Sequence, residues 1–353
     1  MSEPGLGLDR SFKSLAIIVI ILAAFHFGGN LIMPILFSGL VAIILTPFAD
    51  FMERKKIPRG LSAVLAVLVA SLFLIGILFM LVIQSQEIVN EVPRLIIQKS
   101  ETFDVREIQV RSKVVIDYIE EHITTIEESI EQLKSTSISI LKSSLIGLKD
   151  TILFLIICPV YIFFMLLCRD NVYHFFLGFY ERNGSAGEKD KKLIKDIKDS
   201  LFHYLKGLAL IMSISGTLTA IGLYSIGLDY ALFLGVLTAA LTPIPYIGVT
   251  ISAIIPILLA FLTKDGYMTA VGVLIVFAIV QFLENYVLTP KIMGKSINVN
   301  PLIIILGLII FGAISGVIGM ILTVPILAII KLIVSHYPYL RPWKLLLQDK
   351  KND

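Results

Sequence analysis

Long stretches without charged residues most constrain how this chain can fold. A helix needs about 20 apolar residues to cross the ~30 Å hydrocarbon core of a bilayer, and most of the stretches reach that length. They predict an all-α polytopic membrane protein whose surroundings are the lipid bilayer. The stretches, almost free of charge, are 14–27, 31–48, 61–83, 145–168, 207–228, 230–262, 268–288 and 301–330.

Composition supports this class and argues against others. The chain is 56% hydrophobic and 16% charged, whereas soluble domains are roughly a quarter charged. The net charge of +3 comes without a basic patch interleaved with aromatic residues, so no nucleic-acid partner is expected. Cys158 and Cys168 fall in one apolar stretch, which favours buried thiols over a disulfide or a metal site.

The ends and loops predict an orientation. Arg10 and Lys13 precede the first apolar stretch, which we interpret as a retained signal anchor rather than a cleaved signal peptide. The loop after the second stretch carries Arg54, Lys55, Lys56 and Arg59. Since short cytoplasmic loops are enriched in Lys and Arg, both termini are expected to be cytoplasmic.

The chain divides into five parts. Residues 1–83 hold three membrane helices, and 84–145 form an external helical segment. Residues 146–206 hold a fourth membrane helix and a cytoplasmic amphipathic linker, 207–331 form a transport core, and 332–353 form a cytoplasmic tail. Around 193–208 the linker has apolar residues at helical spacing with lysines opposite, which is typical of an interfacial helix.

The external segment contains a heptad pattern. Its isoleucines and a leucine between 116 and 133 are spaced alternately by three and four residues. This pattern fits a lone amphipathic helix that packs on its own protein, or contact between neighbouring protomers. The second alternative would make the protein a homo-oligomer.

Two apolar stretches are too long for a simple membrane span. As straight helices, 230–262 and 301–330 would measure ~45–50 Å. Each is also interrupted near its middle, the first by Pro243 and Pro245 and the second by Gly312 and Gly316. Prolines end helices, and glycines allow the chain to turn. We therefore expect two re-entrant helical hairpins beside about six spanning helices; the alternative is eight spanning helices, two of them tilted and kinked.

Charge placement slightly favours hairpins, because they put Lys291 and Lys295 on the cytoplasmic side. The hairpin interpretation also exposes a repeat of a spanning helix followed by a hairpin. Leu-Gly recurs in the first arms at 234–235 and 306–307, and Pro-Ile-Leu in the second arms at 256–258 and 325–327. Inverted repeats whose broken helices meet at mid-membrane are typical of secondary transporters.

One ionisable residue lies inside a predicted spanning helix. Glu284 shares a helix face with Gln281 and Asn285 at i, i+3 and i+4 spacing. An intramembrane carboxylate is costly and usually faces a cavity or a partner, so this face is a candidate for cation binding or proton exchange. The alternative is that Glu284 pairs with Lys291 or Lys295 near the helix end.

Other polar residues are weaker candidates. Ser213, Ser215, Thr217 and Thr219 suit close helix packing or substrate contact. Asn298 and Asn300 suit a turn or an inner vestibule. The expected transport path comprises Pro243, Pro245, Tyr246, Gly248, Gln281, Glu284, Asn285, Asn298, Asn300, Gly312, Ser315 and Gly316, with Glu284 as the ion-coupling candidate.

Motifs of enzymes are absent from the sequence. There is no GxSxG, HExxH, CxxC or Walker A motif, and the five histidines show no ligand spacing. We expect no catalytic residue, no metal and no cofactor, and no ATP-driven pump within this chain.

Together, several motifs resemble the autoinducer-2 exporter (AI-2E) family. They are 243–248 (PIPYIG), 284–294 (ENYVLTPKIMG), 300–302 (NPL), the 311–319 segment, Val324-Pro325 and Pro159-Val160-Tyr161 followed by Arg169-Asp170. The resemblance covers nearly the whole chain. It implies a multi-pass transporter of the plasma or inner membrane, commonly a homo-oligomer, named for export of a quorum-sensing signal.

Three functions remain open from the sequence. The first is a secondary transporter that exports a small solute or signalling molecule, with H⁺ or Na⁺ coupling. The second is a Na⁺(Li⁺)/H⁺ antiporter, an activity that some members of the family resemble. The third is a non-transporting membrane scaffold.

Overall fold

The computed structural model describes residues 28, 32–102, 156–181, 188–262, 266–293, 299–337 and 340–347. Across these ranges the chain is helical apart from turns and short connections. By length and composition alone, five helices among these residues could cross a membrane: Ile32–Arg54, Arg59–Ile88, Lys191–Ser225, Tyr267–Ile292 and Pro301–His336, the last of which is broken at Ser315 and Gly316. A sixth would combine Ile156–Leu167 with Arg169–Phe175 across a 74° bend. The predicted all-α polytopic fold is confirmed. The 116–133 heptad pattern lies outside the described residues.

Small side chains hold the N-terminal helices together. The Ile32–Arg54 helix packs against the start of α2 (Arg59–Thr102) and against Ile156–Leu167. The buried contact includes Ala42, Ala49, Ala63 and Ala66, and such small residues let membrane helices approach closely. Cys158 is a free, buried thiol in this contact. Between residues 68 and 79, α2 exposes large apolar side chains such as Leu72 and Phe73, as a lipid-facing helix would.

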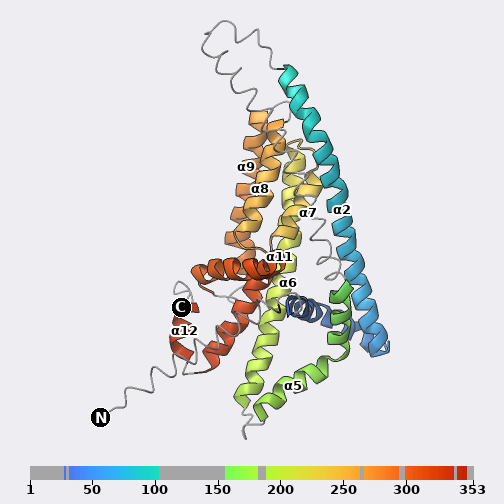
Figure 1. Cartoon of the computed structure of the whole chain (residues 1–353), viewed down its shortest axis with the longest axis vertical. Coiled ribbons are helices and arrows are strands. Elements are labelled where there is room, and N and C mark those ends of the chain that lie inside the picture. Colours follow the sequence, from blue (N-terminus) through green and yellow to red (C-terminus); the bar gives the residue numbers. More distant parts are fainter. Residues whose placement is uncertain are drawn as a thin grey trace, which may run out of the picture.

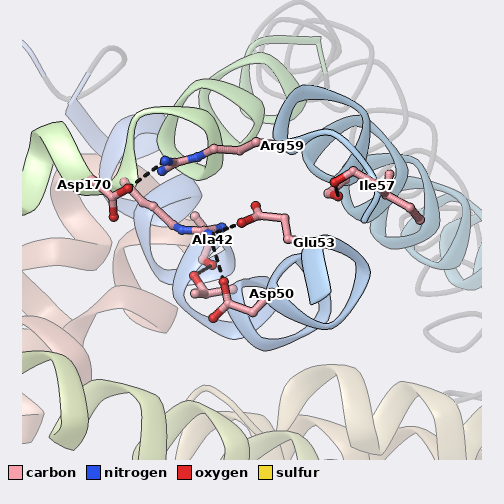
Figure 2. A network of polar contacts seen from close by, with 9 residues as sticks. Ala42, Asp50, Glu53, Ile57, Arg59 and Asp170 are labelled. Carbon is pink, nitrogen blue, oxygen red and sulfur yellow. Dashed lines mark hydrogen bonds and ion pairs between the residues drawn. The ribbon is translucent and has the colours of Figure 1, made fainter. Parts of the chain in front are cut away.

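An ion-pair network fastens one end of these helices (Figure 2). Arg59 of α2 contacts Asp170 at 2.6 Å. Arg169 contacts Asp50 at 2.9 Å and Glu53 at 2.6 Å. Because Arg59 donates to its carboxylate, the pKa of Asp170 lies below its ordinary range. The network joins the basic loop at 54–59 to the start of α5 (Arg169–Glu181).

The structure merges the predicted linker with the next spanning helix. α6 (Glu188–Ser225) is one helix of 38 residues, about 57 Å long. The 193–208 stretch is therefore continuous with the spanning helix and is not a separate element. Its apolar stripe is buried in the protein instead, because Tyr204 and Leu205 pack against Val324.

The first long stretch forms a helical hairpin. α7 (Ala231–Leu241) and α8 (Ile247–Leu262) are joined by a turn in which Tyr246 adopts φ 62. Gly248 lies so close to the carbonyl of Leu241 that a Cβ would clash with it. α7 returns along α6, with Gly216 against Gly235 and Ala239. The two prolines between Leu241 and Tyr246 thus end a helix, as predicted.

The second long stretch is a hairpin too. α11 (Pro301–His336) is interrupted at Ser315 (φ −144, ψ 23) and Gly316 (φ 58, ψ −138). Across this break, Gly319 lies against the carbonyl of Phe311, and Gly307 lies against Thr323 and Leu327. These pairs place the two arms antiparallel. The alternative of two long kinked spans does not describe either stretch.

The two hairpins enter from opposite ends of the α6–α9 pair. α9 (Gly266–Leu283), the π-helix η1 (Glu284–Leu288) and α10 (Thr289–Ile292) run antiparallel to α6. Gly272 faces Ile226 at one end, and Gly207 faces Ile292 and Met293 at the other. α7 begins at the first of these ends and α11 follows α10 at the second, so the chain twice forms a long helix followed by a hairpin. Figure 1 shows α7, α8 and α9 in the upper half, α5 and α12 (Arg341–Leu347) below, and α11 between them.

The predicted sequence repeat is only partly reflected in contacts. Pro256 and Pro325 both lie inside the second arm of their hairpins and both are buried. Gly235, however, packs on α6, whereas Gly307 packs on the second arm of its own hairpin. The glycines of the two matched Leu-Gly pairs therefore pack in different interfaces, one with α6 and one within the second hairpin.

Candidate functional site

The carboxylate of Glu284 meets a hydroxyl of the neighbouring long helix. Ser215 Oγ donates a hydrogen bond of 2.7 Å to Glu284 Oε2. Ser215 is fully buried, and Glu284 is half-buried. Along α6, Ser215 lies ~14 Å from Lys206 and ~15 Å from Ser225, so the pair lies well inside the charge-free part of the helix. The structure thus favours an intramembrane partner over the alternative ion pair with Lys291, whose side chain is exposed; Lys295, the other alternative, lies outside the described residues.

The helix changes its winding at this residue. Glu284–Leu288 is a π-helix, in which the N–H of Thr289 donates to the carbonyl of Glu284. Single π-turns inside α-helices occur frequently at functional sites. The predicted polar face is only partly formed, since Gln281 is half-buried like Glu284, whereas Asn285 is exposed.

A cleft lies where the first hairpin meets the second. It encloses about 400 Å³, which is within the usual range of small-molecule sites. Of the residues predicted to form the transport path, Tyr246 and Gly312 line this cleft. The other lining residues are Ile247, Ile305, Leu308, Ile309, Ala313 and Met320.

The lining of this cleft is mostly apolar, so the cleft is not a polar path. Apart from the Tyr246 hydroxyl, the lining side chains offer no strong hydrogen-bonding group. Apolar surface would contact the carbon skeleton of a ligand, and the tyrosine supplies a single polar handle. Sequence reasoning missed the apolar members because isoleucine and leucine at these positions do not differ from ordinary membrane-helix residues.

The remaining predicted residues serve mainly to build turns and caps. Pro243 and Pro245 form the turn of the first hairpin, and Ser315 and Gly316 form that of the second. Asn300 caps α11 by accepting from the Leu302 N–H, and its amide donates to the Leu346 carbonyl at 3.3 Å. This supports the turn interpretation of Asn300. Asn298 lies outside the described residues.

Polar atoms without partners mark two further places. Thr219 Oγ1 on α6 and Ser315 Oγ at the second turn are buried and have no hydrogen-bond partner in the described part of the chain. In the same ranges, no group of three or more His, Cys, Asp or Glu residues could hold a metal ion. In the described α6–α11 region, the polar chemistry inside the membrane therefore rests on the Glu284 carboxylate, the amides of Gln281 and Asn285, and hydroxyl groups.

Comparison with known proteins gives a consistent result over nearly the whole chain. The family described as AI-2E family transporter matches residues 15–339. The Bacillus subtilis protein YueF is 32% identical over 320 residues, which cover 86% of this chain and 84% of that protein. YrrI of the same organism is 28% identical over 326 residues, 88% of each chain. The AI-2 transport protein TqsA of Escherichia coli is 26% identical over 323 residues, 90% of this chain and 89% of TqsA.

Proposed function

The chain belongs to the AI-2E transporter family, and from this premise we propose that it is a secondary transporter that exports a small solute or signalling molecule across the plasma membrane. The observation that carries the proposal is the meeting of two hairpins from opposite ends at one cleft. Broken helices that converge in this way form the substrate sites of secondary transporters.

The driving force would come from an ion gradient. The sequence has no nucleotide-binding loop, and Glu284 is a half-buried carboxylate inside a membrane helix. A carboxylate in this position can bind and release H⁺ or Na⁺ as the protein changes conformation. We propose Glu284 as the coupling residue.

The apolar lining of the cleft narrows the substrate class. A fully hydrated ion gains little from isoleucine, leucine and methionine side chains, whereas a small organic molecule buries its carbon skeleton there. The relative TqsA is named as an AI-2 transport protein. An autoinducer-2-like quorum-sensing signal is therefore the first substrate to test.

A Na⁺(Li⁺)/H⁺ antiporter is the second candidate. The Ser215–Glu284 pair supports it, because hydroxyl and carboxylate oxygens are the ligands that hard cations prefer. Antiport would need no organic substrate in the cleft.

Flux into liposomes separates the candidates. Purified full-length protein would be reconstituted with an internal pH dye and screened with labelled organic solutes and with Na⁺ or Li⁺ gradients. Solute flux that depends on an ion gradient supports the exporter, and H⁺ flux driven by Na⁺ alone supports the antiporter. No flux under any gradient would leave the scaffold function and would contradict both.

In the proposed topology both termini lie in the cytoplasm. The connections that enter and leave the second hairpin also lie there. Labelling of single cysteines in a background without Cys158 and Cys168 tests it. Lys295→Cys should react only with reagents that reach the cytoplasm, and Lys264→Cys only with external reagents. External labelling of Lys295→Cys would contradict this topology. Cross-linking of intact membranes would test the proposed homo-oligomer.

A further inference from the structure

Two hydroxyl groups on α6 depart from the local hydrogen-bonding pattern. Ser213 donates to the Ala209 carbonyl at 2.8 Å, and Thr217 donates to the Ser213 carbonyl at 2.7 Å. This bond to the fourth preceding carbonyl is the ordinary way for a membrane helix to satisfy a hydroxyl. Ser215 instead donates to Glu284, and Thr219 Oγ1 is buried without a partner among the described residues.

Both exceptional residues lie on the face of α6 that contacts α9. Ser215 meets Glu284, Gly222 meets Val276, and Ile226 meets Gly272. Residues 215, 219, 222 and 226 follow the i, i+4, i+7, i+11 spacing of a single helix face. Thr219 therefore lies in the same interface as Glu284, one helical turn from Ser215, and it is 0% exposed.

Helix packing alone does not account for the hydroxyl groups of Ser215 and Thr219. Glycine and alanine provide the closest approaches of α6, at Gly216 and Ala220 toward α7 and at Gly222 toward α9. A buried hydroxyl without a hydrogen-bond partner is destabilising, and a valine would fill the position of Thr219 without that cost. The unsatisfied oxygen is thus a feature that the interface keeps for another partner.

We propose that Glu284, Ser215 and Thr219 form an intramembrane site for a small monovalent cation across the α6–α9 interface. The inference rests on the proposed transport function and adds the two α6 hydroxyls to the coupling site. A carboxylate has about four lone-pair positions, and Ser215 is its one donor in the described chain. An alkali cation would use the free lone pairs of all three residues. A proton would make Glu284 a donor, for which the Thr219 oxygen is an acceptor in the same interface.

Among the described helices around Glu284, no other charge lies at this depth. Residues 207–228 carry no Asp, Glu, Lys, Arg or His, and α7, α8 and residues 301–330 carry none. After Glu284, the next charged residue along the η1–α10 stretch is Lys291, whose side chain is exposed. Within the described chain Glu284 thus has no fixed basic partner, and a mobile cation would neutralise its charge.

Binding can be measured apart from transport on the full chain in lipid nanodiscs. Radiolabelled Na⁺ binding with Li⁺ competition reports an alkali cation, and infrared titration of the carboxyl band reports a proton. Glu284→Gln should abolish the signal. Ser215→Ala and Thr219→Val should each shift the affinity or the titration midpoint by about tenfold or one pH unit. Thr217→Val, which loses only a bond to its own helix, should match the unmodified protein.

Each outcome decides the inference. Na⁺ binding with this variant pattern identifies an alkali site, and a carboxyl titration with the same pattern identifies a proton site. Neither signal, or equal effects of Thr219→Val, Ser215→Ala and Thr217→Val, would overturn the site. If the site binds its cation but liposomes show no flux of any solute, the proposed function fails while the site stands.

Discussion

Ser215 and Glu284 are 69 residues apart in the sequence, and their side chains meet at 2.7 Å between two long antiparallel helices. The bond joins the long helix of the first helix–hairpin unit to that of the second. Any ion that neutralises Glu284 would therefore change a contact between the two units. Under the proposed coupling, this contact would link ion binding at Glu284 to relative movement of the two units.

Glu284→Gln should abolish the dependence of transport on pH and on Na⁺, because an amide neither titrates nor attracts a cation. Liposome flux measured across pH and Na⁺ series checks this. Lys291→Gln is the matched control, since its side chain is exposed and not bonded to Glu284. Unchanged pH and ion dependence in Glu284→Gln would rule out the coupling role.

Ala313→Phe should inhibit solute flux while leaving the protein folded. Ala313 is exposed and lines the cleft between the hairpins, so a phenyl group would occupy the space of a ligand. Val317→Phe is the control, because Val317 is 57% exposed and does not line the cleft. Equal flux in both variants, at equal reconstitution, would exclude the cleft as the substrate path.

Gly319→Ala should destabilise the second hairpin by about 1–3 kcal/mol, because a Cβ has no room against the Phe311 carbonyl. Thermal unfolding in nanodiscs measures the effect. Gly76→Ala in α2 has open space around its Cβ and should be neutral or stabilising by roughly 0.5–1 kcal/mol. Equal behaviour of the two variants would contradict the antiparallel packing of the arms.

Arg169→Ala should lower the free energy of unfolding by about 1.5–3 kcal/mol, because it leaves Asp50 and Glu53 without their shared cation. Arg54→Ala, at an exposed position of the same helix end, should change stability little. Thermal unfolding in nanodiscs distinguishes Arg169→Ala from Arg54→Ala. A loss in Arg54→Ala as large as in Arg169→Ala would show that net charge, not the network in Figure 2, matters.

Much of the fold can be predicted from the sequence, because the length of the apolar stretches and the residues that interrupt them are enough for that prediction. Stretches of 30 or so residues interrupted by Pro243 and Pro245, or by Gly316, cannot be simple spans of a ~30 Å core, and the structure has hairpins there. The continuity of α6 could not be predicted. The stripe at 193–208 is apolar whether it faces lipid or protein, and only the contact with Val324 decides between them.

The site was predictable in part for a similar reason. A carboxylate in an apolar helix stands out, so Glu284 was identified from the sequence. Its partner Ser215 did not stand out, because α6 carries hydroxyls at 213, 215, 217 and 219 and spacing alone does not say which face meets α9. The π-turn at Glu284 has no signature in the residues, and it leaves Asn285 exposed where regular spacing predicted a shared polar face.

The central claim is that this chain moves a solute along a path between its hairpins, driven by an ion that binds at Glu284. Flux of labelled autoinducer-2 and other small organic solutes into liposomes, with and without a pH or Na⁺ gradient, tests it most directly. We expect gradient-dependent solute flux that Ala313→Phe blocks and Glu284→Gln uncouples. Absence of any solute or ion flux from well-folded, reconstituted protein would contradict the account.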